Sequence, residues 1–564
     1  MKKIFGILVA LVLTVALALP AIAFGPVNPP LTPYDVLIKN GTIVDGTGAP
    51  AFRGHVFIKD GKIAKVVEQS ADAKKTKSAT KIADLAMQAK KVIDASGLVV
   101  APGFIDNHAH GSAFGRCESK IYQGVTTEIR GPCGGGLGLR AYNPKRDYVS
   151  LSGYFNCMEE QGVSLNVGAW VGQSTIRGLV IGSRVDRAPT EEEMERMKRL
   201  VAAGMEGGAF GLSTGLIYPP SSYADTDELV ELVKVIARYG GVYKSHIRGE
   251  GDELLEAVAE AIEIGERAGV PVSICHFKCA GSSAWKAGLM VKAIELIEAA
   301  RARGVEVTTE QYPYLAGSTG SGALIPTWAR EGGTEEMLER FRDPEIRAIL
   351  KQQIYEEIPC PGWWNLIAAA DGWGRIVFTS NPYVGKTFVE IAQIRGVDDP
   401  ADALFDMYLD GISGGIIIYL MCDEDVELAM QQPWNAVGSD GSAVTLRIGG
   451  TGHPRSFGTW PRVLGVYVRE KGVLTLEDAV RKMTWLPAQQ IGITDRGKIA
   501  VGMAADITIF DPETVIDKAT YLVPHQFPEG IPYVIVNGVV VIYDGEHTNA
   551  MPGIPIRLTE MNGH

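Results

Sequence analysis

The sequence predicts an α/β protein with a (β/α)8 barrel (TIM barrel) and a small β-sandwich domain built from both chain ends. Between residues 99 and 496, eight short apolar runs alternate with segments of helical pattern. Such alternation favours a parallel sheet covered by helices. Short strand patterns with glycine turns flank this region on both sides. We therefore expect the barrel domain to be inserted between the two halves of the smaller domain.

The chain begins with a pattern typical of a secretory signal peptide. Met1, Lys2 and Lys3 precede an apolar stretch from Ile4 to Leu19, and Pro20-Ala21-Ile22-Ala23 follows. A basic start, an apolar core and small residues at the end favour cleavage after Ala23. The sequence therefore predicts a signal peptide over residues 1–23 and an exported protein, periplasmic or secreted. An uncleaved anchor is the alternative, because residues 4–24 are almost long enough to span a bilayer.

The predicted small domain covers residues 34–98 and 497–546. Asn40-Gly41 and Asp60-Gly61 separate apolar runs in the first part, and Asn537-Gly538 does so in the second. These dipeptides between apolar runs are hairpin signals. A stretch rich in lysine and alanine, residues 70–91, interrupts the first part and is expected to be an exposed helix or loop.

The predicted barrel has eight strands, which we expect to end near His110, Arg130, Gly172, Thr214, His246, His276, Glu310 and Asp440. Thr190 to Glu193 form a capping box that opens a helix. Helices are also expected over residues 226–239 and 252–268, each of which stops at glycine. The interval from Glu310 to Asp440 is too long for one helix. It predicts an insertion within about residues 315–375 that lies over the barrel mouth.

The composition excludes some partners. The net charge of −12 speaks against nucleic acid, since phosphate binding needs a basic surface. Beyond the signal region, no segment is long and apolar enough to cross a membrane. The seven cysteines are sparse and irregularly spaced, so they do not form a disulfide scaffold. Their odd number leaves at least one free thiol.

Four of the nine histidines and one aspartate end apolar runs. His108 and His110 project to the same side, because residues i and i+2 of a strand share a face. His246, His276 and Asp440 end three further runs. In a barrel, the carboxyl ends of the strands meet at one face, where active sites lie. Imidazole and carboxylate ligands together predict a site for one or two divalent ions, with zinc as the default.

Cys133 lies just past the second predicted strand and is the candidate for a ligand that bridges two ions. Glu128 is the rival bridge, although it lies inside the strand rather than at its end. A bound metal ion brings the pKa of water from about 15.7 to roughly 7 and polarises a carbonyl group. Asp440 would take the proton of that water and pass it to the leaving group. The predicted reaction is metal-assisted hydrolysis of an amide or a related bond.

Several motifs resemble those of the amidohydrolase superfamily, and within it the N-acyl-D-amino-acid deacylase (D-aminoacylase) family. The resemblance extends from about residue 34 to 546. The motifs are PGFIDNHAH (102–110), GVTT (124–127), GPCG (131–134), GLSTGLIY (211–218), SHIR (245–248), HFK (276–278), QYPY (311–314), GSDG (438–441) and HPR (453–455).

The resemblance implies roles for individual residues. Cys133, His246 and His276 would hold a tightly bound zinc ion. His108, His110 and Asp440 would form a second, weaker metal position, with Asp440 as the catalytic base and acid. A third group would bind the free carboxylate of a small-molecule substrate: Lys278, Tyr312, Ser318 and Arg455.

The chain departs from the family pattern around these motifs. Gly111-Ser112 follow the two histidines of the first motif, where acidic residues are usual. Gln173 and Phe277 each stand where the family commonly has His, and Gly249 stands where it commonly has an acidic residue. These changes alter the pocket lining and leave the proposed ligands and base in place. A dipeptidase or a cyclic-amide hydrolase (dihydropyrimidinase-like) on the same fold is the alternative function. A catalytically silent binding protein is disfavoured, because every ligand and Asp440 are retained.

Overall fold

The computed structural model describes residues 34–69, 89–111, 113–137, 150–360, 362–444 and 452–561. The predicted signal peptide lies outside these ranges, and so do residues 70–88 of the Lys/Ala-rich stretch. The last residues of that stretch begin strand β4 (Ala89–Asp94). None of the helices in the described ranges is long and apolar enough to cross a membrane.

All eight predicted strands of the central region are present, two of them in two pieces. They are β6 (Phe104–His110), β7 (Val125–Arg130), β8 (Asn166–Ala169) with β9 (Val171–Gly172), β10 (Gly211–Gly215), β11 (Val242–His246), β12 (Val272–Ile274), β13 (Val307–Gln311) and β18 (Asn435–Val437) with β19 (Gly441–Ser442). Neighbouring strands pair in parallel in this order. β19 then pairs in parallel with β6, so the order of pairing returns to the first strand. The carboxyl ends of these strands therefore converge.

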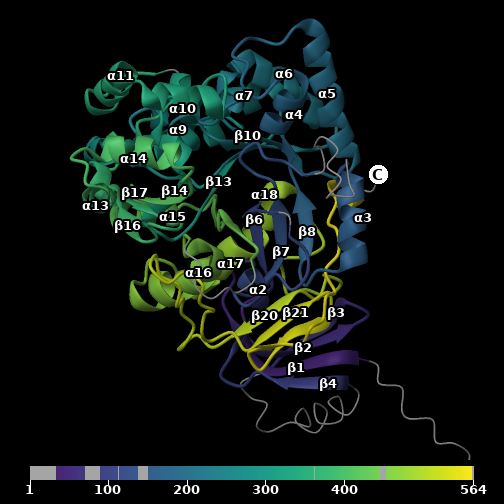
Figure 1. The fold of residues 1–564 in the computed structure, drawn as a ribbon. Coiled ribbons are helices and arrows are strands. Elements are labelled where there is room, and N and C mark those ends of the chain that lie inside the picture. The colour runs from purple at the N-terminus through teal and green to yellow at the C-terminus, as the bar shows by residue number, and fades with distance from the viewer. Residues whose placement is uncertain are drawn as a thin grey trace, which may run out of the picture.

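Helices connect successive strands and pack around them (Figure 1). Those of the first half are α2 (Glu118–Ile121), α3 (Leu151–Gln161), α4 (Gln173–Val180), α5 (Glu191–Glu206), η2 (Ser221–Tyr223), α6 (Thr226–Ala237), α7 (Leu254–Ala268), α8 (Ser282–Lys286) and α9 (Leu289–Ala302). Those near the end are α15 (Asp423–Met430), α16 (Arg455–Arg462), the π-helix η6 (Val463–Glu470), α17 (Leu476–Met483), α18 (Trp485–Ile491) and α19 (Leu558–Met561). The capping box predicted at Thr190 is confirmed at the start of α5.

The two chain ends form one nine-stranded sheet at the lower end of the molecule in Figure 1. Besides β4 it contains β1 (Tyr34–Ile43), β2 (Phe52–Lys59), β3 (Lys62–Glu68), β5 (Val99–Pro102), β20 (Ile507–Phe510), β21 (Tyr533–Val536), β22 (Val539–Tyr543) and β23 (Glu546–His547). The early and late segments meet where β5 pairs antiparallel with β20. Their side chains share one apolar cluster, in which Val36 and Val56 pack with Ile507 and Ile535.

Two of the three predicted hairpin turns are confirmed. Asp60-Gly61 joins β2 to β3 and Asn537-Gly538 joins β21 to β22, and each dipeptide has two positive φ angles, as a tight two-residue hairpin requires. The prediction at Asn40-Gly41 is wrong. β1 continues through this dipeptide, and its register with β2 shifts between Ile38 and Gly41, which marks a bulge rather than a turn.

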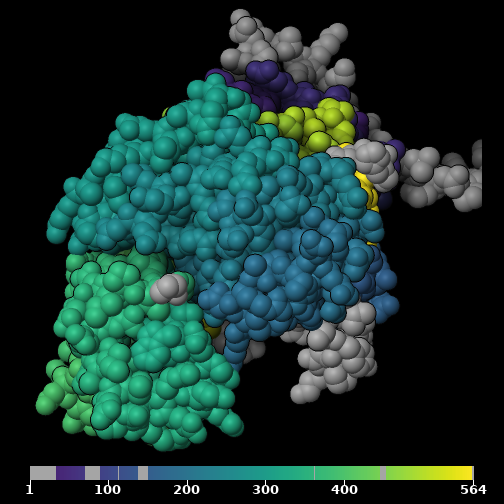
Figure 2. Space-filling model, turned by 90° about the horizontal axis from the view of Figure 1, so that it is seen from above, coloured from purple at the N-terminus to yellow at the C-terminus, as the bar shows by residue number. Residues whose placement is uncertain are grey.

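The segment between β13 and β18 forms a separate lobe (green in Figure 2) with an antiparallel sheet of its own. Its strands are β14 (Ala316–Gly320), β15 (Ile376–Phe378), β16 (Lys386–Thr387) and β17 (Gly415–Tyr419). Its helices are η3 (Ser321–Leu324), η4 (Thr327–Arg330), α10 (Thr334–Arg342), α11 (Pro344–Tyr355), α12 (Leu366–Ala369), η5 (Trp373–Arg375), α13 (Phe388–Arg395) and α14 (Pro400–Leu409). The lobe thus extends past the predicted limit of residue 375, because β14 pairs with the distant β17.

A lysine on α17 is fully buried beneath the central strands. Lys482 donates from Nζ to the backbone oxygen of Asn435 at 3.2 Å and to that of Gln432. Burial lowers the pKa of Lys482 from 10.5 to about 8. Below about pH 8, Lys482 is protonated in both the folded and the unfolded chain. Between about pH 8 and pH 10.5, Lys482 is protonated only in the unfolded chain, so its contribution to the free energy of unfolding rises with pH.

We expect the unfolding free energy of the protein to rise relative to that of Lys482→Met as the pH passes from about 8 to 10.5. At 1.36 kcal/mol per pKa unit the gain amounts to about 3 kcal/mol. Urea unfolding of both proteins across this range measures it. The control is Lys292→Met, which replaces an exposed lysine on α9. A difference that does not change with pH contradicts the prediction.

Candidate metal centre

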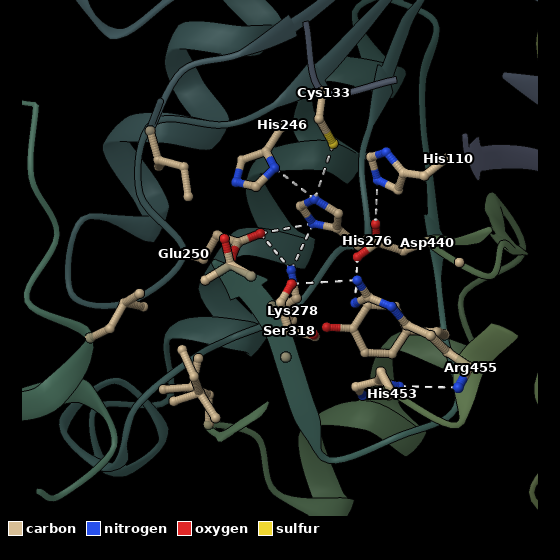
Figure 3. A pocket seen from close by; sticks show the side chains of 18 of the residues that line it. His110, Cys133, His246, Glu250, His276, Lys278, Ser318, Asp440, His453 and Arg455 are labelled. Carbon is tan, nitrogen blue, oxygen red and sulfur yellow. Dashed lines mark hydrogen bonds and ion pairs between the residues drawn. The ribbon is translucent and has the colours of Figure 1, made fainter. Parts of the chain in front are cut away.

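The six predicted ligands lie together at the carboxyl ends of the central strands, and all of them except His108 are labelled in Figure 3. His108 and His110 are on β6, His246 is the last residue of β11, and Cys133, His276 and Asp440 lie in the loops just past β7, β12 and β18. These three loop residues have left-handed backbone, with φ of 53°, 32° and 49°. Non-glycine residues rarely adopt this conformation, and strain of this kind clusters at functional sites.

The ligand atoms form two sets that share one cysteine. His108, His110, Cys133 and Asp440 have atoms within 4.8 Å of one another, and so do Cys133, His246 and His276. Cys133 Sγ lies 3.4 Å from His108 Nε2 and 3.8 Å from His276 Nε2. The ring nitrogens His246 Nδ1 and His276 Nε2 are 2.8 Å apart. Thiol, imidazole and carboxylate donors in this proximity fit one or two divalent cations.

The rival bridge, Glu128, belongs to neither set. Its side chain is fully buried and forms an ion pair with Arg130. None of the seven cysteines, all of which lie in the described ranges, forms a disulfide bond. Cys133 is therefore the residue that lies between the two groups of donors.

Two buried glutamates contact the ring nitrogens of His108 and His276 and orient these rings. Glu310 Oε1 contacts His108 Nδ1 at 2.6 Å and accepts from the backbone N–H of His276 at 2.5 Å, and its other oxygen pairs with Lys244. Glu250 Oε1 lies 2.8 Å from His276 Nδ1. A carboxylate on one ring nitrogen fixes the tautomer and leaves the other nitrogen available to a metal ion. The sequence analysis missed the role of Glu310 and did not single out Glu250, whose only signal is its place four residues after His246.

We expect Glu250→Gln to weaken metal binding about 10- to 100-fold, the range found when such supporting groups are removed. The amide keeps the shape of the carboxylate but lacks the charge that pairs with Lys278 Nζ at 2.5 Å. Competition with a chelator of known affinity measures the change. Glu256→Gln, which alters an exposed position on α7, is the matched control. Equal affinities of the variant and the original protein contradict the assignment.

Asp440 contacts two of the histidine donors through one oxygen and Arg455 through the other. Its Oδ1 lies 2.8 Å from His110 Nε2 and 3.2 Å from His108 Nε2, and its Oδ2 pairs with Arg455 Nη1 at 2.6 Å. Burial by itself would raise the pKa of Asp440, but the Arg455 guanidinium and His108 hold it well below its usual range. Asp440 is therefore ionised at neutral pH.

The residues predicted to bind a carboxylate line the same cavity of about 390 Å³ as Cys133 and Asp440. The Arg455 guanidinium lies 5.0 Å from the centre of the Tyr312 ring, and its Nη2 donates to the backbone oxygen of Ser318 at 3.4 Å. Lys278 Nζ lies 5.8 Å from the same ring. Burial raises the pKa of Tyr312, so its phenol stays protonated and can donate.

The other histidines lie away from the ligand sets. His453 is buried beside Arg455, where its Nδ1 accepts from the Arg455 backbone N–H at 3.1 Å and its Nε2 contacts the Ala316 oxygen at 2.7 Å. His55 and His547 are buried and hydrogen-bonded in the sheet region. His525 packs against Phe457. His564 lies outside the described residues.

Comparison with known proteins places the chain in a family. The family model described as "Amidohydrolase family" matches residues 91–352 and 414–542. The D-aminoacylase of Alcaligenes xylosoxydans xylosoxydans is 32% identical over 539 residues, which cover 91% of this chain and 96% of that protein.

Two solved structures are similar over nearly the whole chain. One is N-acyl-D-glutamate deacylase from Bordetella bronchiseptica, complexed with zinc and a phosphonate inhibitor that mimics the tetrahedral intermediate of the reaction. It is 32% identical in sequence with a TM-score of 0.74, and the match covers 93% of this chain and 99% of that one. A D-aminoacylase described with a binuclear metal center is 31% identical with a TM-score of 0.73, covering 93% and 100%. The chain therefore belongs to the amidohydrolase family and, within it, to the D-aminoacylases and their relatives, and it is a metal-binding hydrolase of carbon–nitrogen bonds other than peptide bonds.

Proposed function

We propose that this protein is a zinc-dependent N-acyl-D-amino-acid deacylase, which hydrolyses the amide to a carboxylate and a free D-amino acid. One observation carries the proposal: donors from both metal sets and the predicted carboxylate-binding groups line one cavity and meet at the Asp440–Arg455 ion pair. The names of the similar proteins support the substrate class.

The proposed zinc ligands divide between two positions. Cys133, His246 and His276 hold the tight ion, and His108, His110 and Asp440 form the weaker second position, with Cys133 between them. The zinc in the related N-acyl-D-glutamate deacylase and the binuclear center of the related D-aminoacylase support this division. When bound, such an ion supplies a water of lowered pKa and polarises the amide carbonyl.

Asp440 performs the proton transfers in this proposal. Its Oδ1 accepts the proton of the attacking water and afterwards gives a proton to the nitrogen of the leaving amine. Its ionised form, which Arg455 and His108 stabilise, suits the first of these steps. Arg455 binds the substrate carboxylate with the planar fork that matches a carboxylate in two-point geometry. Lys278, Tyr312 and Ser318 complete the carboxylate site.

We also propose the domain arrangement and location. A (β/α)8 barrel over residues 99–496 is supported by the parallel pairings that return from β19 to β6. The β-sandwich over residues 34–98 and 497–546 is supported by the apolar cluster that both chain ends share. The basic, apolar and small-residue segments of residues 1–23 support export to the periplasm or medium, with a small molecule as the partner.

A hydrolysis screen tests the proposed function. The purified, zinc-loaded protein is offered N-acetyl-D-amino acids, N-acetyl-L-amino acids, dipeptides and cyclic amides, and its metal content is measured in the same sample. Release of free amino acid from the D-substrates alone, with about one zinc ion held tightly, is the expected result. Turnover of dipeptides or cyclic amides only, with zinc bound, overturns the substrate assignment in favour of the alternative hydrolases.

A further inference from the structure

The first strand of the lobe contacts the start of helix α16 through two of its carbonyl groups. This strand, β14, stands at the end of the strand order of the lobe sheet. The Ala316 oxygen contacts His453 Nε2 at 2.7 Å, and the Ser318 oxygen accepts from Arg455 Nη2 at 3.4 Å. The lobe therefore touches both His453 and Arg455, the arginine that we propose binds the substrate carboxylate.

His453 is hydrogen-bonded at both ring nitrogens. Arg455 is the first residue of α16, so its backbone N–H has no partner inside the helix, and His453 Nδ1 accepts from it at 3.1 Å (Figure 3). Burial and the neighbouring Arg455 hold the pKa of His453 well below its usual range, so the ring is neutral and has one donor and one acceptor. Because Nδ1 accepts, Nε2 carries the hydrogen and donates it to the Ala316 oxygen. A single tautomer thus joins the lobe to the backbone of Arg455.

Three tyrosine rings hold the imidazole in its place. The ring of His453 lies edge-on to Tyr312, Tyr314 and Tyr521, with centres 5.6, 5.2 and 5.2 Å away and interplanar angles of 64°, 89° and 87°. Such edge contacts are a preferred geometry of aromatic rings. His453 is only 7% exposed. The ring is therefore enclosed in the orientation that both of its hydrogen bonds require.

His453 provides the stronger of the two links between Arg455 and the lobe. Its contacts of 2.7 and 3.1 Å lie within the normal range of hydrogen bonds, about 2.7–3.2 Å, whereas the contact from Arg455 Nη2 to Ser318 is longer. The Asp440 carboxylate, 2.6 Å from Arg455 Nη1, pulls the guanidinium toward the metal donors. His453 fixes the backbone from which this side chain extends.

We propose that His453 is a positioning residue for Arg455: it holds the start of α16 against the edge of the lobe sheet and thereby aims the guanidinium at the substrate carboxylate. The inference rests on the proposed deacylase function and adds to its carboxylate site a residue that acts through Arg455. In this arrangement the lobe determines the direction of the carboxylate-binding group.

Two substitutions break the link at opposite ends. In His453→Asn the side-chain oxygen can take the place of Nδ1, but no donor reaches the Ala316 oxygen. In His453→Gln the amide nitrogen can take the place of Nε2, but the acceptor for the Arg455 N–H is lost. Positioning needs both bonds, so each variant should lose it. Either variant that folds, as its melting temperature shows, is sufficient for the test.

The zinc-loaded proteins are compared on N-acetyl-D-leucine and on its neutral amide, N-acetyl-D-leucinamide. For the acid we expect KM to rise roughly 10-fold in both variants, the range of a charge-assisted hydrogen bond. We expect kcat to stay within about threefold, because loss of uniform binding raises KM alone. The kcat/KM of the amide, which has no carboxylate, should not change. Inhibition by D-leucine and by D-leucinamide gives the same comparison without turnover of the amide.

His547 provides the matched control. Its Nδ1 also accepts from the backbone N–H two residues later, that of Asn549, at 2.9 Å, and its Nε2 lies 3.0 Å from Ser164 Oγ. The bonding pattern is the same, but His547 lies in the sheet formed by the chain ends. His547→Asn and His547→Gln should leave KM unchanged for both substrates.

The outcomes separate the positioning role from the proposed function. If a folded variant of His453 keeps the original KM for the acid, or loses kcat/KM equally for acid and amide, the positioning role is refuted and the deacylase function stands. If the original protein hydrolyses no N-acyl-D-amino acid, the proposed function fails, and this inference fails with it.

Discussion

In Asp440→Asn we expect kcat for the N-acyl-D-amino acid to fall by about 10²- to 10⁴-fold, the usual contribution of a general acid–base group. Asparagine has nearly the same shape but cannot accept the proton of the attacking water. Cys133, His246 and His276 lie in a donor set that does not include Asp440, so the tight metal ion should stay bound. Steady-state kinetics and metal analysis of the same sample measure both expectations.

The control separates proton transfer from general damage to the site. Asp252→Asn changes an exposed aspartate near the start of α7 and should leave kcat unchanged. A variant of Asp440 that keeps its metal and turns over at the original rate contradicts the role of Asp440 as base. Loss of turnover together with loss of the tight ion would instead assign Asp440 to metal binding.

Glu310→Gln should lower the free energy of unfolding by about 3–5 kcal/mol, the cost of leaving one member of a buried ion pair alone. Lys244 is fully buried and its ammonium pairs with Glu310, and Glu310 also contacts His108 and the His276 backbone. The amide removes the counter-charge while the lysine stays buried. Urea unfolding of the two proteins without added metal measures the difference.

A double variant and a surface pair make this prediction specific. Lys244→Met with Glu310→Gln removes both charges, so most of the lost stability should return. Glu263→Gln breaks the exposed pair with Arg267 on α7, at 2.9 Å, and should cost less than about 0.5 kcal/mol. Equal losses in Glu263→Gln and Glu310→Gln contradict the assignment of the cost to burial.

The positions of the histidines were predictable from the sequence, because the strand pattern fixes which residues end a strand. His108 and His110 show this directly, since two residues in alternation must share a face. The six candidate ligands lie together at the strand ends, as the pattern indicates. Their roles at the metal positions remain predictions.

The supporting residues and the lobe could not be read in the same way. Glu250 belongs to a loop, and only the folded path of that loop brings its carboxylate to His276. Asn40-Gly41 continues the strand because β1 pairs with β2, β4 and β5. A dipeptide alone does not reveal these pairings with other segments. In the lobe, β17 pairs with β14 across about a hundred residues, and a local sequence pattern does not reveal such a pairing.

The lobe contributes Ser318 and Thr319 to the cavity wall, whereas the metal donors come from the central strands and their loops. The metal donors and this part of the cavity wall are thus encoded in different stretches of the gene. Mutations in the lobe can alter this part of the wall without replacing any candidate metal ligand, because none of the six lies in the lobe. The shape of this wall can therefore evolve while the candidate metal ligands stay unchanged.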